Sequence, residues 1–146
     1  MNTVIAKSWH ELIEILFADS FNEELERHRS PYGFRGMTDA NYELQTSLTR
    51  LKHPIERVAR IESRLLNSFQ KYAHGFFDEK YSNWHWLALA QHHGLPTRLL
   101  DWTFSPFVAL HFATDDLTKS DKDGVVWCVN LFETQHYLPE DLRQFF

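Results

Sequence analysis

The sequence predicts an α+β fold, in which several helices pack on a small mixed or antiparallel sheet. Stretches with the apolar spacing of helices recur between capping and helix-breaking residues, whereas few segments have the pattern of strands. Apolar residues make up 43% of the 146-residue chain, which holds 12 Phe and 5 Trp. Such a chain can bury one aromatic-rich core but is too short for two domains of ordinary size. We therefore expect a single domain over residues 1–146.

The first helix is expected to begin at about residue 9. Residues 8–11 have the Ser-x-x-Glu form of a capping box. The charged stretch 21–29 is expected to continue this helix and to fray before a turn at residues 30–31. Residues 32–36, YGFRG, then predict a short extended piece that ends at a glycine. The apolar residues of the first helix recur at helical spacing, at Trp9, Leu12, Ile13, Leu16 and Phe17.

A long helix, of about twenty residues, is expected between Pro54 and Gly75. Proline favours the first helical position, and glycine is a natural residue just beyond a helix end. The segment 37–53 is expected to be a loop with one short strand around residues 42–44. The apolar side chains Ile55, Val58, Ala59, Ile61, Leu65, Leu66, Phe69, Tyr72 and Ala73 outline one face. Four charged residues are assigned mostly to the other faces, namely Arg57, Arg60, Glu62 and Arg64.

Two shorter helices and a strand complete the pattern. A helix over 84–93, capped by Asn83, is expected to end at Gly94, and Ser105-Pro106 is typical of the start of the next. The run VVWCVNLF, residues 125–132, is apolar on both faces, as in a strand with a neighbour on each side. Because few other segments resemble strands and a further helix is expected from 139, we expect an incomplete sheet. We therefore expect the chain to be the N-terminal part of a longer domain.

Several classes of protein and site are disfavoured. The net charge is −5, and Lys and Arg are scattered along the chain, so no nucleic-acid partner is expected. A single cysteine, Cys128, permits neither a disulfide framework nor a cysteine-rich metal site and fits a reducing, cytoplasmic location. No signal peptide or membrane-spanning stretch is recognisable, so no membrane partner is expected. The histidines and Asp101 have no recognised zinc-ligand spacing, and no metal site is expected.

Polar residues gather between the helix end at Gly94 and the helix start at Ser105. We expect the apolar residues of 99–112 to build core and the polar ones to rim a crevice that faces Arg35. The tryptophans Trp84, Trp86 and Trp102 are interpreted as core rather than as a stacking platform. The candidate side chains of this segment are Gln91, His92, Thr97, Arg98, Asp101 and Thr103.

Each candidate has a structural alternative. Arg35 can grip an anion with its fork of donors, or can pair with a buried carboxylate such as Asp101. Asp101 can orient Arg35 or Arg98, or can simply anchor the turn. His92 can transfer a proton or contact a ligand, or can bind loose carbonyls at the helix end, as Gln91 and His93 can. The hydroxyls of Ser47, Thr97 and Thr103 can contact a ligand or form local caps.

Three blocks of the sequence resemble the FRG domain family. Phe34-Arg35-Gly36 looks like the tripeptide that gives the family its name. LQTSLTR, residues 44–50, is similar to its Leu-x-x-Ser-Leu-x-Arg stretch, and LALAQHHGLPTRLLDWTFSPFVALHFAT, residues 87–114, looks like its longest shared block. The blocks occur in the family's order within residues 30–131. The family's domain continues into segments with Arg-Ile and Gln-x-Gly-Phe patterns, which have no match here.

The resemblance says more about the fold than about a reaction, because the family is mostly without assigned activity. Its motif order is loosely similar to that of ADP-ribosyltransferase-like folds, which bind NAD. In such a site Arg35 would hold the pyrophosphate or a ribose, Thr103 would contact a ribose hydroxyl, and Asp101 and His92 would complete the catalytic set. Gln91, Thr97 and Arg98 would add ligand contacts, with NAD as the candidate cofactor of a possible enzyme.

Two other classes stay open. The first is a non-catalytic module that binds a protein or a small anion beside a bacterial defence or toxin effector. The second is a scaffold in which the FRG and LLDWT blocks merely stabilise the fold.

Overall fold

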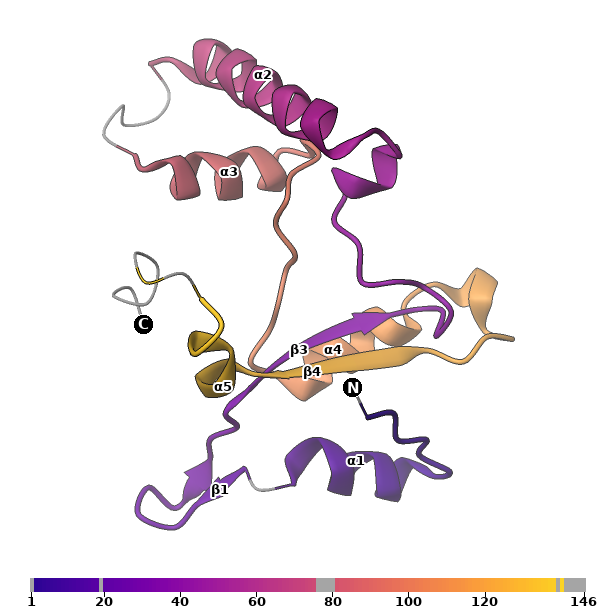
Figure 1. Ribbon diagram of the computed structural model, residues 1–146. Coiled ribbons are helices and arrows are strands. Elements are labelled where there is room, and N and C mark those ends of the chain that lie inside the picture. The colour runs from indigo at the N-terminus through magenta and orange to yellow at the C-terminus, as the bar shows by residue number, and fades with distance from the viewer. Residues whose placement is uncertain (1, 19, 76–80, 139, 141–146) are drawn as a thin grey trace. The chain divides into compact units, whose positions relative to one another are not determined.

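The computed structural model describes residues 2–18, 20–75, 81–138 and 140. Over these residues the chain forms an α+β fold with five α-helices and two antiparallel sheets of two strands each (Figure 1), as the sequence predicts. Its contacts divide it into a strand unit, residues 1–42 and 102–146, and a helix unit, residues 43–101. The single domain over 1–146 stays a prediction, because a division by contacts does not show that either unit folds alone.

The strand unit is built around two paired strands. β3 and β4 run antiparallel in unbroken register, from Tyr32 opposite Asn130 to Met37 opposite Val125. Thr103 adds an isolated antiparallel bridge to Phe34 of β3. In chain order the elements of the unit are α1 (Trp9–Phe17), β1 (Phe21–Asn22), β2 (Arg27–His28), β3 (Tyr32–Met37), α4 (Pro106–Thr114), the 3-10 turn η2 (Leu117–Lys119), β4 (Val125–Asn130) and α5 (Leu131–Gln135).

The core of the strand unit lies where α1 and α4 pack on one face of β3. Leu16, Phe34, Ala109 and Leu110 form its buried cluster. The closest approach is at Gly36, where an added Cβ would lie 1.7 Å from the carbonyl oxygen of Ala109. Only a residue without a side chain allows the backbone of α4 to lie this close to a strand. The glycine of the FRG tripeptide therefore sets the spacing between α4 and β3.

The helix unit consists of the 3-10 turn η1 (Thr49–Leu51), α2 (Ile55–Ala73) and α3 (Asn83–His92). Phe69 of α2 meets the Trp86 ring of α3 edge-on, with 6.2 Å between ring centroids. Both predicted glycine stops are confirmed, since Gly75 and Gly94 adopt φ angles of 88° and 85° just beyond the helices. None of the described helices combines the length and the apolar character that a membrane crossing requires.

The helix starts follow local capping chemistry. Ser8 and Ser105 cap α1 and α4 as predicted, because their hydroxyls accept the N–H groups of residues three positions on. Two starts differ by one residue from the prediction. Pro54 is the cap of α2 rather than its first residue, and Ser82 rather than Asn83 caps α3.

The prediction that 21–29 continues the first helix is wrong. This stretch forms the β1–β2 hairpin, in which Phe21 pairs with His28. Its turn is stabilised by the Asn22 side chain, which accepts the N–H of Leu25 at 2.9 Å. Asn side chains compete in this way with the helical backbone bonds, and the stretch has no apolar helical stripe to oppose them.

Two strand predictions also need correction. Residues 42–44 form no strand. The strand predicted over 125–132 ends at Asn130, whose side chain accepts the N–H groups of Phe132 and Glu133 and so begins α5. Among the described residues β4 pairs only with β3, which agrees with an incomplete sheet. The helix predicted from 139 lies largely outside the described residues.

Much of the aromatic set lies on the surface rather than in the core. Trp86 is buried as predicted, but Trp84 and Trp102 are 52% and 37% exposed. On α4, small and aliphatic residues face β3 because Gly36 admits only a close, flat contact. The phenylalanines of α4 lie outside that contact and are both 54% exposed, and the Phe107 ring centroid lies 5.4 Å from that of Phe17 in α1. Phe104, just before the helix, is 76% exposed.

Candidate functional site

The candidate residues are divided between the two units. Arg35 and Thr103 belong to the strand unit. The other candidates belong to the helix unit, namely Gln91, His92, Thr97, Arg98 and Asp101. Each group is described within its own unit, and the crevice expected between Arg35 and the 91–105 turn stays a prediction.

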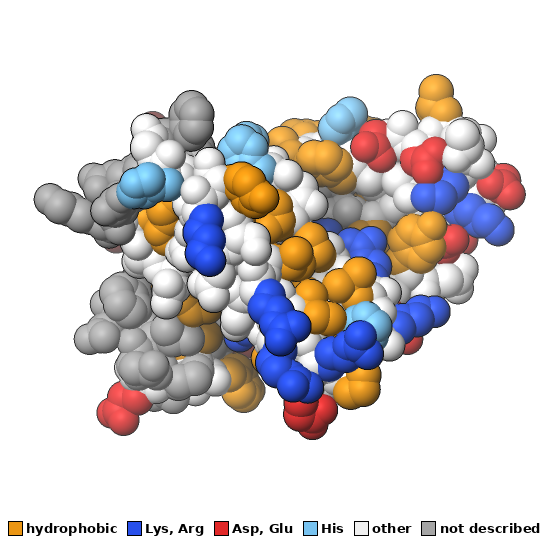
Figure 2. Space-filling model, turned by 90° about the horizontal axis from the view of Figure 1, so that it is seen from above, with side chains coloured by type: hydrophobic (Ala, Val, Ile, Leu, Met, Phe, Trp, Pro, Cys, Tyr) orange, Lys and Arg blue, Asp and Glu red, His pale blue; other side chains and the backbone are white. Residues whose placement is uncertain are grey.

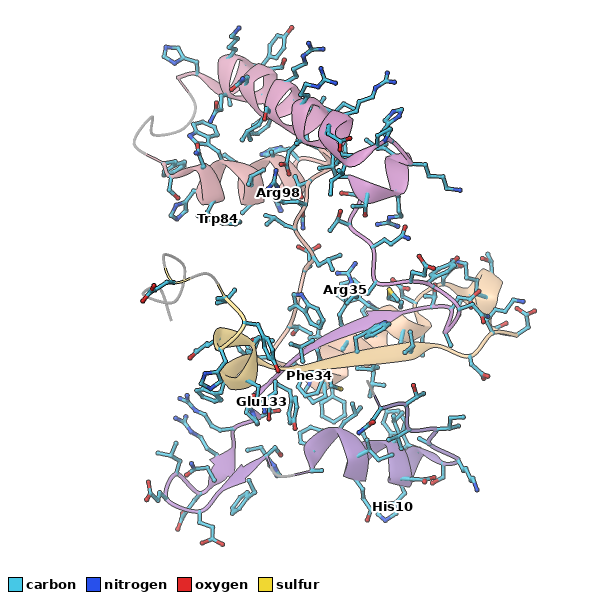
Figure 3. All side chains as sticks on the ribbon, in the orientation of Figure 1. His10, Phe34, Arg35, Trp84, Arg98 and Glu133 are labelled. Atoms are coloured by element: carbon cyan, nitrogen blue, oxygen red, sulfur yellow. The ribbon has the colours of Figure 1, made fainter. Side chains whose placement is uncertain are left out.

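Arg35 lies on the face of β3 away from α4. Side chains alternate along a strand, so Arg35 projects opposite to Phe34, which enters the core (Figure 3). The register places Trp127 of β4 directly opposite Arg35, and paired residues are side-chain neighbours on one face. Both residues are half-buried, and the Trp127 Nε1 is enclosed without a hydrogen-bond partner among the described residues. This face combines a guanidinium, an aromatic plane and an indole donor.

Thr103 serves the backbone next to Arg35 rather than its exposed face. Its main chain exchanges two hydrogen bonds with Phe34, at 2.7 and 2.9 Å. Its hydroxyl accepts the N–H of Ser105 at 3.1 Å, just before α4 begins. Because bridge partners share a face, the Thr103 side chain lies on the Phe34 side. This geometry matches the local-cap alternative for Thr103.

A hydrogen-bonded chain of side chains holds the turn after α3. Thr97, only 2% exposed, donates its hydroxyl to the Gln91 side-chain oxygen. The Gln91 amide in turn donates to Asp101 Oδ1. The backbone of Thr97 is fixed on the other side, because its N–H donates to Ser47 Oγ at 3.0 Å and its carbonyl accepts the N–H of Leu48 at 3.2 Å. Gln91, Thr97 and Asp101 are therefore brought together and act as anchors of this turn.

Arg98 pairs with the buried carboxylate of Glu62, a residue predicted to lie off the apolar face of its helix. Glu62 of α2 is 5% exposed. Its Oε1 accepts the backbone N–H of Arg98 at 3.0 Å, and its Oε2 accepts from Arg98 Nε at 2.6 Å and pairs with the terminal guanidinium nitrogen. The hydrogen bond to Glu62 raises the pKa of Arg98 above its ordinary value. The carboxylate thus clamps the turn onto α2.

The assignment of Glu62 to a face other than the apolar one is wrong. Residues 58, 62, 65 and 69 share one helix face by their spacing. A charged residue within that apolar stripe is the signal that could have identified Glu62, since a carboxylate there needs a partner.

His92 is the last residue of α3, and its side chain is exposed. Its ring meets that of His93 at 86°, with 5.6 Å between centroids. His93 packs instead on Phe69, at 5.7 Å. The two neighbouring histidines are both exposed, but His93 also contacts α2.

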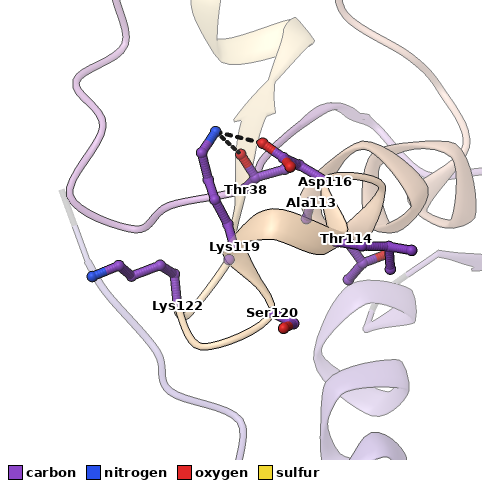
Figure 4. A pocket seen from close by; sticks show the side chains of 9 residues that line it. Thr38, Ala113, Thr114, Asp116, Lys119, Ser120 and Lys122 are labelled. Atoms are coloured by element: carbon purple, nitrogen blue, oxygen red, sulfur yellow. Dashed lines mark hydrogen bonds and ion pairs between the residues drawn. The ribbon is translucent and has the colours of Figure 1, made fainter.

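A cavity of about 270 Å³ lies within the strand unit, at the C-terminal end of α4 (Figure 4). In it, Lys119 Nζ pairs with Asp116 at 2.8 Å and donates to Thr38 Oγ1 at 3.3 Å. The pair raises the pKa of Lys119 to about 12 and, with Thr118, lowers that of Asp116 to about 2. Because these charges satisfy each other, we interpret the Asp116–Lys119 pair as a brace of the 115–124 loop. The cavity beside it is not interpreted as a ligand site.

Comparison with known proteins points to one family. The sequence model of the FRG domain matches residues 30–122, more than half of the chain, and this range includes every candidate predicted from the sequence but not Trp127. No curated protein and no solved structure matches the chain.

Proposed function

The chain belongs to the FRG domain family, and we propose that it binds a nucleotide of the NAD class in an ADP-ribosyltransferase-like manner. In this proposal Arg35 holds the pyrophosphate on the face of β3 away from α4. The neighbouring Trp127 offers its aromatic plane to a base or a nicotinamide ring.

The observation that carries the proposal is the direct pairing of Arg35 with Trp127 across β3 and β4. A guanidinium presents a planar fork of donors that suits phosphate oxygens. Indole stacks on flat heterocycles. A cation and a stacking surface next to one another suit the phosphates and the rings of a dinucleotide.

The residues beside Arg35 support nucleotide binding more directly than they support catalysis. Neither β3 nor β4 carries an Asp or Glu that could polarise a ribose hydroxyl beside Arg35. Asp101 and His92 stay candidates for orientation and proton transfer, but their contacts within the helix unit do not require a ligand. Nicotinamide release would therefore need a group from outside the two strands.

The test is a calorimetric titration of NAD and ADP-ribose into the whole chain and into two variants. Arg35→Gln removes the fork of donors, and Arg27→Gln makes the same change of charge on exposed β2. We expect binding by the parent and by Arg27→Gln, and at least about a tenfold loss for Arg35→Gln, since charge-assisted hydrogen bonds contribute 1.5–3 kcal/mol.

Circular dichroism of each variant checks that it folds. Absence of nucleotide binding by the folded parent chain, or equal binding by both variants, would overturn the proposal. Bound NAD without release of nicotinamide would restrict it to a sensor.

A second candidate is the non-catalytic module beside a bacterial defence or toxin effector. It is favoured by the exposed phenylalanines of the α4 region, Phe104, Phe107 and Phe112, because exposed apolar patches often mark protein contacts. It predicts that a co-expressed neighbouring gene product purifies with the chain and is lost in the variant Phe104→Ser/Phe112→Ser, while neither nucleotide binds.

A further inference from the structure

Basic side chains form a stripe along α2 in the helix unit. Arg57, Arg60, Arg64 and Lys71 recur at spacings of three, four and seven residues. At 100° and 1.5 Å per residue they lie within an arc of about 60° over a length of about 21 Å. All four are exposed, and Figure 2 shows basic side chains gathered on the face of the molecule that α2 forms.

The stripe is not neutralised within the described part of the chain. None of its members takes part in an ion pair there. Of the two carboxylates of α2, Glu62 is buried against Arg98, and Glu56 alone is exposed. Arg50 and Lys52, both exposed, add positive charge just before the helix. This surface is thus cationic on a chain whose net charge is −5.

Such a stripe opposes helix formation when it stands alone. Like charges three or four residues apart destabilise a helix by about 0.2–0.5 kcal/mol per pair, and Arg57–Arg60 and Arg60–Arg64 are such pairs. The apolar face of α2 offsets this cost by packing on α3. An acidic partner that lies along the stripe would remove the repulsion and gain attraction at the same positions.

We propose that the α2 stripe, Arg57, Arg60, Arg64 and Lys71, binds an acidic α-helical segment of a partner protein. Carboxylates spaced three, four and seven residues apart on a helix have the same rise as the cations of α2, so two helices can pair along their lengths.

Two other polyanions fit the surface less closely. An anionic membrane binds an amphipathic helix through its apolar face as well as its charge, and the apolar face of α2 is occupied by α3. A nucleic acid is bound through its phosphates without regard to helical spacing, so it makes no use of the three-, four- and seven-residue order of the stripe. This inference uses other residues than the nucleotide site and does not depend on it.

The test measures binding of a labelled 20-residue Glu/Ala helical peptide by fluorescence anisotropy at low salt, with glutamates placed on one face. The stripe variant is Arg57→Gln/Arg64→Gln. The matched control is Arg27→Gln/Arg29→Gln, which removes the same charge from exposed positions of the strand unit. We expect the parent and the control to agree within twofold and the stripe variant to bind at least tenfold more weakly.

Three comparisons decide the partner class. A peptide of the same composition with its glutamates spread around the helix should bind at least fivefold more weakly than the one-face peptide. A 20-nucleotide single strand and vesicles containing phosphatidylserine should bind more weakly than the one-face peptide. Equal binding of the two peptides, equal loss in the two variants, or tighter binding of the oligonucleotide or the vesicles would each overturn the proposal.

Discussion

The two units of this FRG domain are stabilised in different ways. In the strand unit, the FRG tripeptide acts through backbone proximity, because Phe34 fills the core and Gly36 lets the backbone of α4 lie against β3. In the helix unit, the part of the 87–114 block that follows α3 acts through side-chain hydrogen bonds, which run from Thr97 through Gln91 to Asp101. One motif of the family therefore allows close backbone packing, and another supplies side-chain hydrogen bonds that hold a turn.

This difference changes how each candidate residue is interpreted. Most polar candidates of the helix unit have a partner within their own unit that explains them, such as Glu62 for Arg98. Arg35 lies on the strand face opposite to the core, beside the aromatic ring of Trp127. The nucleotide proposal rests on this neighbourhood, whereas the contacts of the helix unit are explained by the stability of its turn.

The largest effect is expected from Gly36→Ala in the strand unit. Its Cβ would lie 1.7 Å from a backbone carbonyl of α4, so the helix must move as a body. We expect a loss of at least about 3 kcal/mol in the free energy of unfolding, measured by urea denaturation. Gly33→Ala is the control, because its nearest contact would be a flexible leucine side chain at 3.4 Å, and its loss should stay below about 1 kcal/mol. Similar losses for both variants would contradict the shape interpretation.

A smaller effect is expected from Arg98→Ala in the helix unit. The substitution leaves the Glu62 carboxylate buried with the Arg98 backbone N–H as its remaining donor from this residue. We expect a loss of about 2–3 kcal/mol, less than for a fully buried pair because the Arg98 side chain is 56% exposed.

The double variant Glu62→Gln/Arg98→Ala tests the cause. A neutral amide costs less to bury than a carboxylate, so the double variant should be less destabilised than the sum of the two single variants. Additive losses in a double-mutant cycle would show that the two side chains act independently.

The smallest effect is expected at the Asp116–Lys119 brace of the strand unit. Pairing lowers the pKa of Asp116 from 3.8 to about 2, so its contribution to stability is present above pH 4 and is lost as the pH falls through about 2. Asp116→Asn should therefore lower the melting temperature slightly at pH 5, and the difference from the parent should shrink toward pH 2.5. In a Lys119→Gln background, which has no ion pair for Asp116 to lose, the same Asp116→Asn change should have little effect at pH 5 in the same thermal melts.

Local features of the structure were predictable from the sequence. Ser8, Ser105, Gly75 and Gly94 mark helix ends because capping and positive φ depend on a residue and its nearest neighbours in the chain. The extended YGFRG piece and the α+β class follow from pattern in the same way. The candidate turn was also predictable as a polar cluster, although the partner of each side chain was not.

Non-local features required the tertiary structure. The burial of Glu62 and the exposure of Phe107 and Phe112 depend on which surfaces meet, and residues distant in the chain decide that. The basic stripe of α2 arises in the same way, because scattered residues share a face only once the helix forms. The hairpin at 21–28 is local, and Asn22 is the signal that could have predicted it.

The sequence by itself determined the fold class, the family and most helix boundaries, since these follow from short-range periodicity and motif order. Only the tertiary structure decided that Arg35 lies beside Trp127, that Glu62 rather than Asp101 pairs with Arg98, and that Gly36 sets the position of α4. The physical reason is that strand register and close packing are cooperative choices among distant segments, and no local propensity encodes them.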